Sequence, residues 1–274
     1  MFLSTVDASR LAVEVIAIDE ALDRVTAEPV FAKISSPHYH ASAMDGVCVR
    51  AEDTFAATEF VGKKLRLAGP DSIGPDAFAY VDTGNALPSW ANAVIMIEKV
   101  HQIDAQTVEI FESVAPWNHV RLVGEDVVAT ELLLPRSHRL RPYDLGALLA
   151  AGHTTVGVKA RPKVGIIPTG DELIQPGDEA KPGAVIDFNS TVLAAFVQEW
   201  GGTPVRYPRA KDDIAVLRAA LQRAVDECDL VAIIAGSSAG EHDLTAEVVG
   251  KSGRLLAHGI DVMPGKPAVL GLAA

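Results

Sequence analysis

The N-terminal segment carries apolar residues at helical spacing between residues 6 and 30. These residues recur at intervals of three and four positions: Leu11, Val15, Ile18 and Leu22. Such spacing places them on one face of a helix. Asp7 can cap the beginning of this helix and Pro29 can end it. The pattern therefore predicts an N-terminal helix.

A different pattern runs from residue 31 to residue 135. Short apolar runs are separated there by Gly, Pro, Asp and Asn, and they cover residues 47–49, 65–67, 93–97 and 108–111. Short runs with frequent turn residues are typical of a β-rich domain. A helix is predicted again over 141–152, beginning near Pro142 and ending at Gly152.

These two helices bracket the β-rich segment. We therefore expect a helical linker domain made of residues 1–30 and 136–160. The β-rich domain, residues 31–135, is then an insertion into it. Because the insertion leaves and re-enters the linker domain, the molecule is expected to be elongated and multidomain.

Strands and helices alternate from residue 161 onwards. Apolar runs typical of buried strands cover 164–167, 204–207 and 230–235, and helices are predicted over 189–200 and 212–228. This alternation predicts a parallel, doubly wound α/β domain over residues 161–274. A helix over 243–249 and a strand over 254–258 follow. The last apolar run, 268–274, has no successor, so we expect this domain to be incomplete at its C-terminus. The fold class expected for the whole is α/β plus β-rich.

Composition and charge argue against some classes of function. Hydrophobic residues make up 49% of the chain and charged residues 22%, which is typical of a globular protein. The net charge of −12 argues against nucleic-acid binding, because that binding needs clustered Lys and Arg. No apolar run reaches the ~20 residues of a membrane span. A cytoplasmic protein with reduced thiols at Cys48 and Cys228 is expected.

The strongest candidate site is a loop of small residues that follows the apolar run 230–235. It reads Gly236-Ser237-Ser238-Ala239-Gly240, and Asp243 comes shortly after it. Small residues let backbone N–H groups approach an anion closely, and a following helix N-terminus adds positive potential. A carboxylate beside such an anion can hold a hydrated cation. The loop therefore predicts a site for a phosphorylated ligand with a metal.

A second candidate, Thr169-Gly170-Asp171-Glu172, also follows a predicted strand. The carboxyl ends of parallel strands meet at one edge of a sheet, so we expect the two loops to converge. Lys266, between Gly265 and Pro267, could contact phosphate from a rigid turn or be an ordinary surface residue. Asp45-Gly46 and Gly124-Glu125-Asp126 taken singly are typical of turns. The histidines show no metal-binding spacing.

Taken in order, these motifs resemble the molybdopterin molybdenumtransferase family, which includes the E domain of gephyrin. The resemblance covers nearly the whole chain. It rests on residues 42–46 (SAMDG), 82–84 (DTG), 121–126 (RLVGED), 169–173 (TGDEL), 187–190 (DFNS), 236–243 (GSSAGEHD) and 264–267 (PGKP).

The resemblance implies a role in molybdenum cofactor biosynthesis. Members of the family take adenylylated molybdopterin and molybdate, depend on Mg²⁺, and release AMP as molybdenum is inserted. The resemblance also implies a homodimer and an upstream partner, a molybdopterin adenylyltransferase. The linker, inserted and α/β parts expected above fit the fold that it implies.

The family's functional positions map onto acids and small residues of this chain. Catalytic roles are implied for Asp45, Asp126, Glu172 and Asp243, with Glu172 and Asp243 at the metal. Asp45 and Asp126 would reach the site from the partner subunit. Substrate contacts are implied for Thr169, Gly170, Asp212 (or its neighbour Asp213), Gly236, Ser237, Ser238, Gly240 and Lys266.

Three departures from the family keep a second function open. The loop has Ser-Ser-Ala where Ser-Gly-Gly is usual, and Met263 and Gly259 stand where basic residues are common. The remaining part of the family's sheet domain and a β-barrel domain are not in these 274 residues, so this stretch by itself is expected to be inactive. The loop also resembles a branch in which a periplasmic-binding-protein-like module follows.

A regulatory or scaffold relative that binds molybdopterin, molybdate or tungstate without turnover is the alternative. A pterin adenylyltransferase would share the sheet domain, but it would leave the first ~160 residues unexplained.

Overall fold

The computed structural model describes residues 10–69, 74–234, 244–259, 261 and 268–273. Two compact units divide the chain, one formed by Val15–Gly157 and the other by Met1–Glu14 with Val158–Ala274. The protein is a mixed α/β chain with a large β-rich part. The finer division at residues 30, 135 and 160 stays a prediction.

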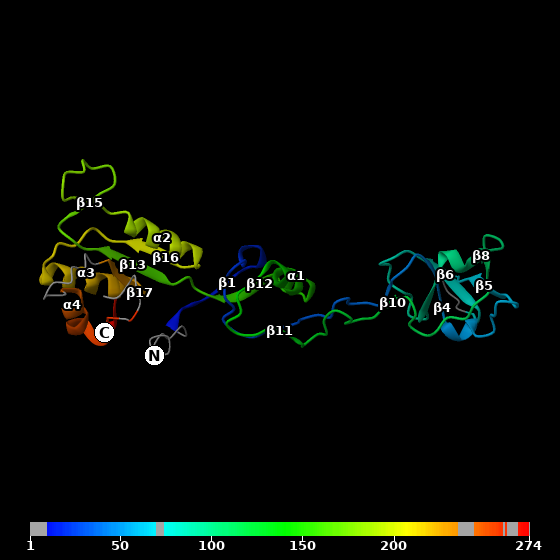
Figure 1. Ribbon diagram of the computed structural model, residues 1–274. Helices are drawn as coiled ribbons and strands as arrows, with labels where there is room; N and C mark the ends of the chain where they lie inside the picture. The colour runs from blue at the N-terminus through cyan, green and yellow to red at the C-terminus, as the bar shows by residue number, and fades with distance from the viewer. Residues whose placement is uncertain (1–9, 70–73, 235–243, 260, 262–267, 274) are drawn as a thin grey trace. The chain divides into compact units, whose positions relative to one another are not determined.

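A six-stranded sheet forms the core of the first unit. Its order is β7 (Ala93–Met96), β4 (Gly46–Val49), β6 (Ala77–Val81), β5 (Lys63–Leu67), β9 (Thr107–Ile110) and β8 (Val100–Gln102). Phe78, Leu65 and Ile110 are fully buried against it. The four apolar runs singled out in residues 31–135 are all strands here, as predicted. Figure 1 shows these strands curling around their shared core.

Short strand pairs and one helix complete this unit. Antiparallel pairs join β2 (Val30–Phe31) to β11 (Leu132–Leu134) and β3 (Ala41–Ser42) to β10 (Val120–Arg121). Helix α1 (Pro142–Ala150) lies within the predicted range 141–152. Short 3₁₀ turns occur at Ile18–Glu20, Ala51–Thr54 and Ile97–Lys99.

The predicted helix over residues 6–30 is wrong for residues 10–30. That segment contains β1 (Val13–Ala17), which pairs with β12 (Thr155–Lys159), and a 3₁₀ turn at Ile18–Glu20. Val13, Val15 and Ile16 are β-branched and favour extended backbone. Pairing with β12 supplies the hydrogen bonds that local spacing could not reveal. The expected linker domain is therefore mixed rather than helical.

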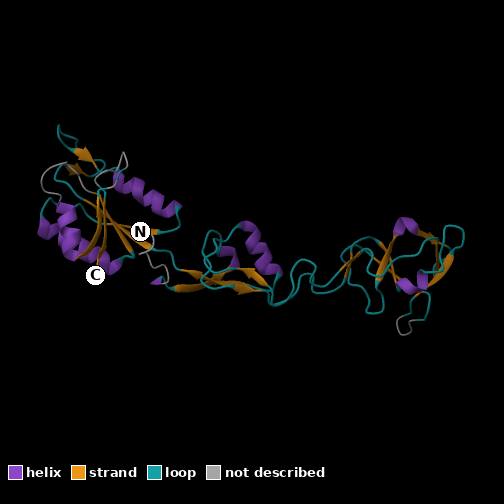
Figure 2. Ribbon diagram, turned by 60° about the horizontal axis from the view of Figure 1, so that its bottom comes forward, coloured by secondary structure: helices purple, strands orange, loops and turns teal. Residues whose placement is uncertain are grey.

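A parallel three-stranded sheet organises the second unit, as the alternation predicts. The order is β16 (Thr203–Arg206), β13 (Lys163–Pro168) and β17 (Leu230–Ile234), with Ile166 opposite both Arg206 and Ala232. Helix α2 (Asn189–Glu199) covers one face, while α3 (Ile214–Glu227) and α4 (Leu244–Ser252) cover the other. Figure 2 shows the same layers from a second direction. The sheet is thus doubly wound, and its carboxyl edge is where a ligand is expected.

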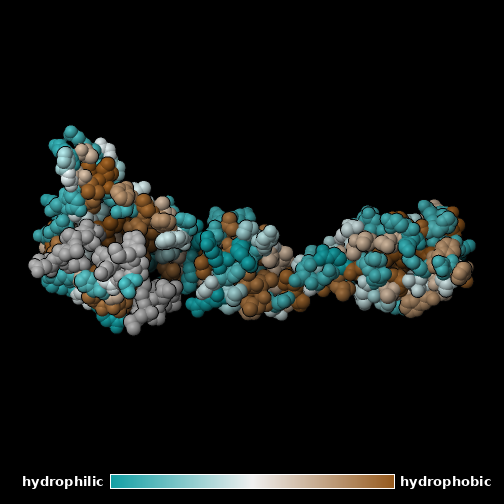
Figure 3. Space-filling view, viewed as in Figure 1, coloured by the Kyte–Doolittle hydropathy of each residue, from teal (hydrophilic) through white to brown (hydrophobic). Residues whose placement is uncertain are grey.

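Two further strand pairs belong to this unit. Strands β14 (Leu173–Ile174) and β15 (Val185–Ile186) are parallel, and β18 (Gly253–His258) and β19 (Val269–Ala273) are antiparallel. Apolar side chains on and around α2 are exposed at four-residue spacing: Phe188, Val192, Phe196 and Trp200. Figure 3 shows hydrophobic, brown surface on this unit near α2. Among the described residues, no helix has the length and apolar character needed to cross a bilayer.

Candidate functional site

Thr169 joins the carboxyl ends of two neighbouring parallel strands. It follows β13 directly and is only 4% exposed. Its backbone N–H and its hydroxyl both donate to the carbonyl of Ile234, at 2.8 and 3.1 Å, where β17 ends. Thr169 also forms a parallel bridge with Ala210, which follows β16. The loop after β13 therefore begins at the centre of the carboxyl edge of the sheet.

Glu172 places its carboxylate over Gly170. A Cβ atom at Gly170 would lie 2.7 Å from Glu172 Oε1, and Gly170 has a φ of +130°. Only glycine accepts both that backbone conformation and that close approach. Glu172 is exposed, so its carboxylate is open to a ligand beyond the strand ends.

Two adjacent acids separate into different structural roles. Asp213 caps α3, because its Oδ1 accepts from the N–H of Val216 at 2.9 Å. Asp212 Oδ2 accepts instead from the N–H of Asp171 at 3.3 Å. Asp212, rather than Asp213, therefore lies beside the loop that carries Glu172.

Arg209 is a residue of this edge that sequence reasoning missed. Its Nη1 donates to the carbonyls of Asp171 and Leu173, both at 2.8 Å, and lies 3.3 Å from the carbonyl of Gly170. A lone arginine after a short strand matches no motif. Only the folded chain brings it to three carbonyls that lie more than thirty positions away.

In the other unit, Asp45 is held by Thr83. Asp45 Oδ1 accepts from the backbone N–H of Thr83 at 2.6 Å and from its hydroxyl at 2.8 Å. These two donors lower the pKa of Asp45 from its ordinary value, because they stabilise the charged form. Asp45 is exposed and therefore stays an available carboxylate. Thr83 lies in a motif of the sequence but was not among the predicted site residues.

Asp126 lies at a hollow that Thr83 also lines. The hollow has a volume of about 390 Å³, and its lining includes Ser36, Tyr39, Ser42, Thr83, Arg121 and Asp126. Arg121 Nη2 donates to Asp126 Oδ1 at 2.8 Å, and both side chains are about half exposed. The structure thus brings Asp126 to the same hollow as Thr83, the partner of Asp45.

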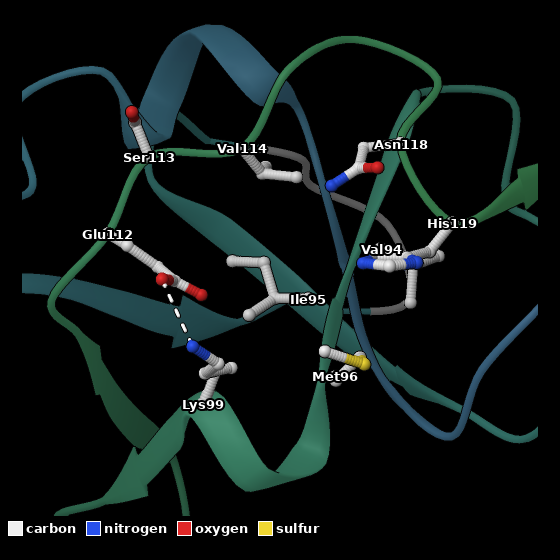
Figure 4. A pocket seen from close by; sticks show the side chains of 9 residues that line it. All are labelled: Val94, Ile95, Met96, Lys99, Glu112, Ser113, Val114, Asn118 and His119. Carbon is white, nitrogen blue, oxygen red and sulfur yellow. Dashed lines mark hydrogen bonds and ion pairs between the residues drawn. The ribbon is translucent and has the colours of Figure 1, made fainter.

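A smaller cavity in the same unit contains none of the predicted residues. It measures about 40 Å³, and Figure 4 shows the Lys99–Glu112 ion pair, at 3.3 Å, beside it. That volume accommodates a water molecule or two but no pterin.

Glu172 suits a Mg²⁺ ion bound together with a phosphorylated ligand. Among the described residues, no group of three His, Cys, Asp or Glu side chains could hold a metal by itself. Mg²⁺ does not need one, since it is often bound by one or two carboxylates, substrate phosphates and water. The exposed carboxylate of Glu172 meets this requirement. The other predicted site residues lie outside the described part of the chain: Gly236, Ser237, Ser238, Gly240, Asp243 and Lys266.

Comparison with family models covers both units. Residues 3–152 match the MoeA N-terminal region (domain I and II), and residues 165–274 match a probable molybdopterin binding domain.

Relatives with known names match over nearly the whole chain. A putative molybdopterin biosynthesis protein of Methanocaldococcus jannaschii is 36% identical over 95% of this chain and 67% of its own length. Molybdopterin molybdenumtransferase 2 of Mycobacterium tuberculosis is 32% identical over 94% of this chain and 67% of its own. The molybdopterin molybdenumtransferase of Nostoc is 30% identical over 93% of this chain and 60% of its own. The chain therefore spans about two thirds of the length of these relatives.

Solved structures agree with the sequence comparison. The molybdopterin biosynthesis MoeA protein of Pyrococcus horikoshii superposes with a TM-score of 0.84 at 34% identity, covering 96% of this chain and 68% of that one. Both the ordered motifs and the fold thus point to the same group of proteins. The chain belongs to the MoeA family, whose named members include molybdopterin molybdenumtransferases.

Proposed function

We propose that the full-length protein inserts molybdate into adenylylated molybdopterin and releases AMP during molybdenum cofactor biosynthesis. One observation carries the proposal. The Thr169–Glu172 loop and Asp212 meet at the carboxyl edge of a parallel sheet, the place where such sheets bind ligands. In a chain of the MoeA family, a phosphorylated pterin is the ligand that suits this edge.

In this proposal Glu172 and Asp243 hold Mg²⁺ beside the phosphates of the substrate. The ion would neutralise charge that develops as the adenylyl phosphate bond breaks. Thr169 and Gly170 supply a rigid loop at the strand ends, and Asp212 orients that loop through Asp171 N–H. The loop at residues 236–240 would cradle phosphate through backbone N–H groups, and Lys266 would add a positive charge.

Asp45 and Asp126 complete the proposed site from the partner subunit of a homodimer. Thr83 holds Asp45 through two hydrogen bonds that lower the pKa of this carboxyl group, and Arg121 orients Asp126 at the hollow. Two fixed carboxylates can bind a metal ion that associates with the molybdate oxyanion. A molybdopterin adenylyltransferase would supply the adenylylated substrate upstream, and a cytoplasmic location fits that supply.

Release of AMP tests the reaction directly. The full-length protein is given adenylylated molybdopterin, molybdate and Mg²⁺, and AMP is measured by chromatography. Glu172→Gln should lower the rate by at least about a hundredfold, because it removes a metal-binding charge without changing shape. Glu179→Gln, at an exposed acid a few residues along the chain, is the matched control and should keep its rate. Equal rates in both variants would refute the role of Glu172.

A non-catalytic relative that binds molybdopterin is the second candidate, and Gly259 favours it. This position, where the family commonly has a basic residue, has a φ of +82° and is fixed by a 2.9 Å bond from its N–H to the carbonyl of Ala268. A basic side chain at this position would be strained in this conformation. Tight binding of adenylylated molybdopterin without molybdate-dependent release of AMP would establish this alternative.

A further inference from the structure

Three backbone carbonyl groups converge as they would around a bound cation, and the guanidinium of Arg209 lies where that cation would be. The oxygens of Gly170, Asp171 and Leu173 all lie within 3.3 Å of one nitrogen, Arg209 Nη1. Carbonyl dipoles that converge on one point repel each other unless a positive charge lies there. Arg209 supplies that charge permanently, because guanidinium does not lose its proton in proteins.

This arrangement fixes the backbone on both sides of Glu172. Asp171 precedes Glu172 and Leu173 follows it, and both of their carbonyls accept from Arg209 at 2.8 Å. The carbonyl of Glu172 accepts separately from Val185 N–H at 2.9 Å. With the backbone held at these points, the Glu172 carboxylate stays over Gly170.

We propose that Arg209 is a positioning residue for the metal site: its guanidinium replaces a bound cation among the carbonyls of Gly170, Asp171 and Leu173 and so holds Glu172 ready for metal binding. The inference rests on the metal-binding role of Glu172 in the proposed function. Arg209 itself touches neither metal nor substrate. Residues that orient a metal ligand in this way commonly change metal affinity by about ten- to a hundredfold.

The test replaces the side chain and then restores its charge from solution. Arg209→Ala removes the guanidinium, and added guanidinium ion at millimolar concentration can enter the space left behind. Mn²⁺, which favours the same oxygen ligands as Mg²⁺, is titrated with adenylylated molybdopterin present and molybdate absent, while its EPR signal reports the free ion. Hydrogen exchange of a peptide covering residues 169–174 reports on the loop itself.

We expect Arg209→Ala to weaken Mn²⁺ binding about tenfold and to speed exchange in residues 169–174, with the melting temperature of the protein little changed. Guanidinium should restore both properties, whereas urea, which has a similar shape but no charge, should not. Arg206→Ala is the matched control, since Arg206 is exposed on the preceding strand β16. It should match the wild type in both measurements.

Two results would overturn the inference. Unchanged exchange in Arg209→Ala would show that the guanidinium does not hold the loop. Faster exchange with unchanged Mn²⁺ affinity would show that the loop does not position the metal ligand. Glu172→Gln separates this failure from failure of the proposed function. If Glu172→Gln alone weakens Mn²⁺ binding, only the role of Arg209 falls, and if both variants bind as the wild type does, the metal role of Glu172 falls as well.

Discussion

At the scale of single residues, the adjacent acids Asp212 and Asp213 have different roles because they accept hydrogen bonds from different segments. Asp213 accepts from Val216 N–H in the first turn of α3, whereas Asp212 accepts from Asp171 N–H in the loop after β13. The family resemblance implies a substrate contact for Asp212, or for its neighbour Asp213. The cap geometry assigns Asp213 to the helix and leaves Asp212 beside Glu172.

Replacing each acid should therefore have a different effect. Asp213→Ala removes the cap of α3 and should lower the free energy of unfolding by about 1 kcal/mol. Asp212→Asn should leave stability within about 0.5 kcal/mol but weaken Mn²⁺ binding, since the loop loses a charged acceptor. Urea denaturation and the EPR titration measure the two properties. A larger stability loss in Asp212→Asn than in Asp213→Ala would contradict this division.

At the scale of elements, one buried carboxylate connects the start of α1 to the chain before it. Asp144 accepts from the backbone N–H of Arg141 at 2.8 Å, from its guanidinium at 3.0 Å, and pairs with His138 Nε2 at 2.7 Å. Its side chain is only 7% exposed. The Arg141 guanidinium, with His138 and the Arg141 N–H, holds the pKa of Asp144 well below its usual range.

This lowered pKa predicts a pH dependence of stability. A carboxyl group whose pKa is lower in the folded state stabilises the fold above its unfolded pKa of about 3.9, and that contribution is lost as the pH falls below it. Asp144→Asn should cost roughly 2 kcal/mol at pH 7. The difference in unfolding free energy between wild type and variant should shrink as the pH falls from 5 towards about 3. Urea unfolding at several pH values measures it, and a difference that is constant with pH would contradict the assignment.

Two features predicted from the sequence, the N-terminal helix and a turn at Gly46, are strand residues in the structure. The apolar spacing around Leu11, Val15 and Ile18 suits a helix, yet Val13–Ala17 is a strand because β12 provides its partner. Gly46 follows an Asp, and an Asp-Gly pair is typical of a turn. Gly46 is instead the first residue of β4, where an added Cβ would lie 2.0 Å from the carbonyl oxygen of Ile95. In both places, pairing with a strand distant in sequence determines the backbone conformation.

At the scale of the whole molecule, the proposed site draws on residues from both units and two subunits. In the proposal, Glu172 acts from the α/β part of one subunit and Asp45 from the β-rich part of its partner. A C2 dimer would then contain two equivalent sites, each made by two chains.

Mixed dimers test this sharing of the site. Asp45→Asn and Glu172→Gln are each expected to be inactive alone. Coexpression should form mixed dimers with one intact site, and random pairing restores about a quarter of wild-type AMP release. Asp45→Asn mixed with Asp126→Asn is the control, because both changes affect the same contribution and no intact site can form. Absence of recovery in the first mixture would show that the site is not shared in this way.

Residue patterns along the chain predicted the alternation of strands and helices from residue 161, the short strands between 31 and 135, and the resemblance to the molybdopterin molybdenumtransferase family. These features depend on local periodicity and on motifs that are contiguous in the chain. The folded chain was needed to show that Asp213 caps a helix, that Thr83 binds Asp45, and that Arg209 donates to three carbonyls. Such contacts join segments far apart in sequence or depend on the exact end of an element. Their energy depends on distances of a few ångströms, which no pattern of residue types records.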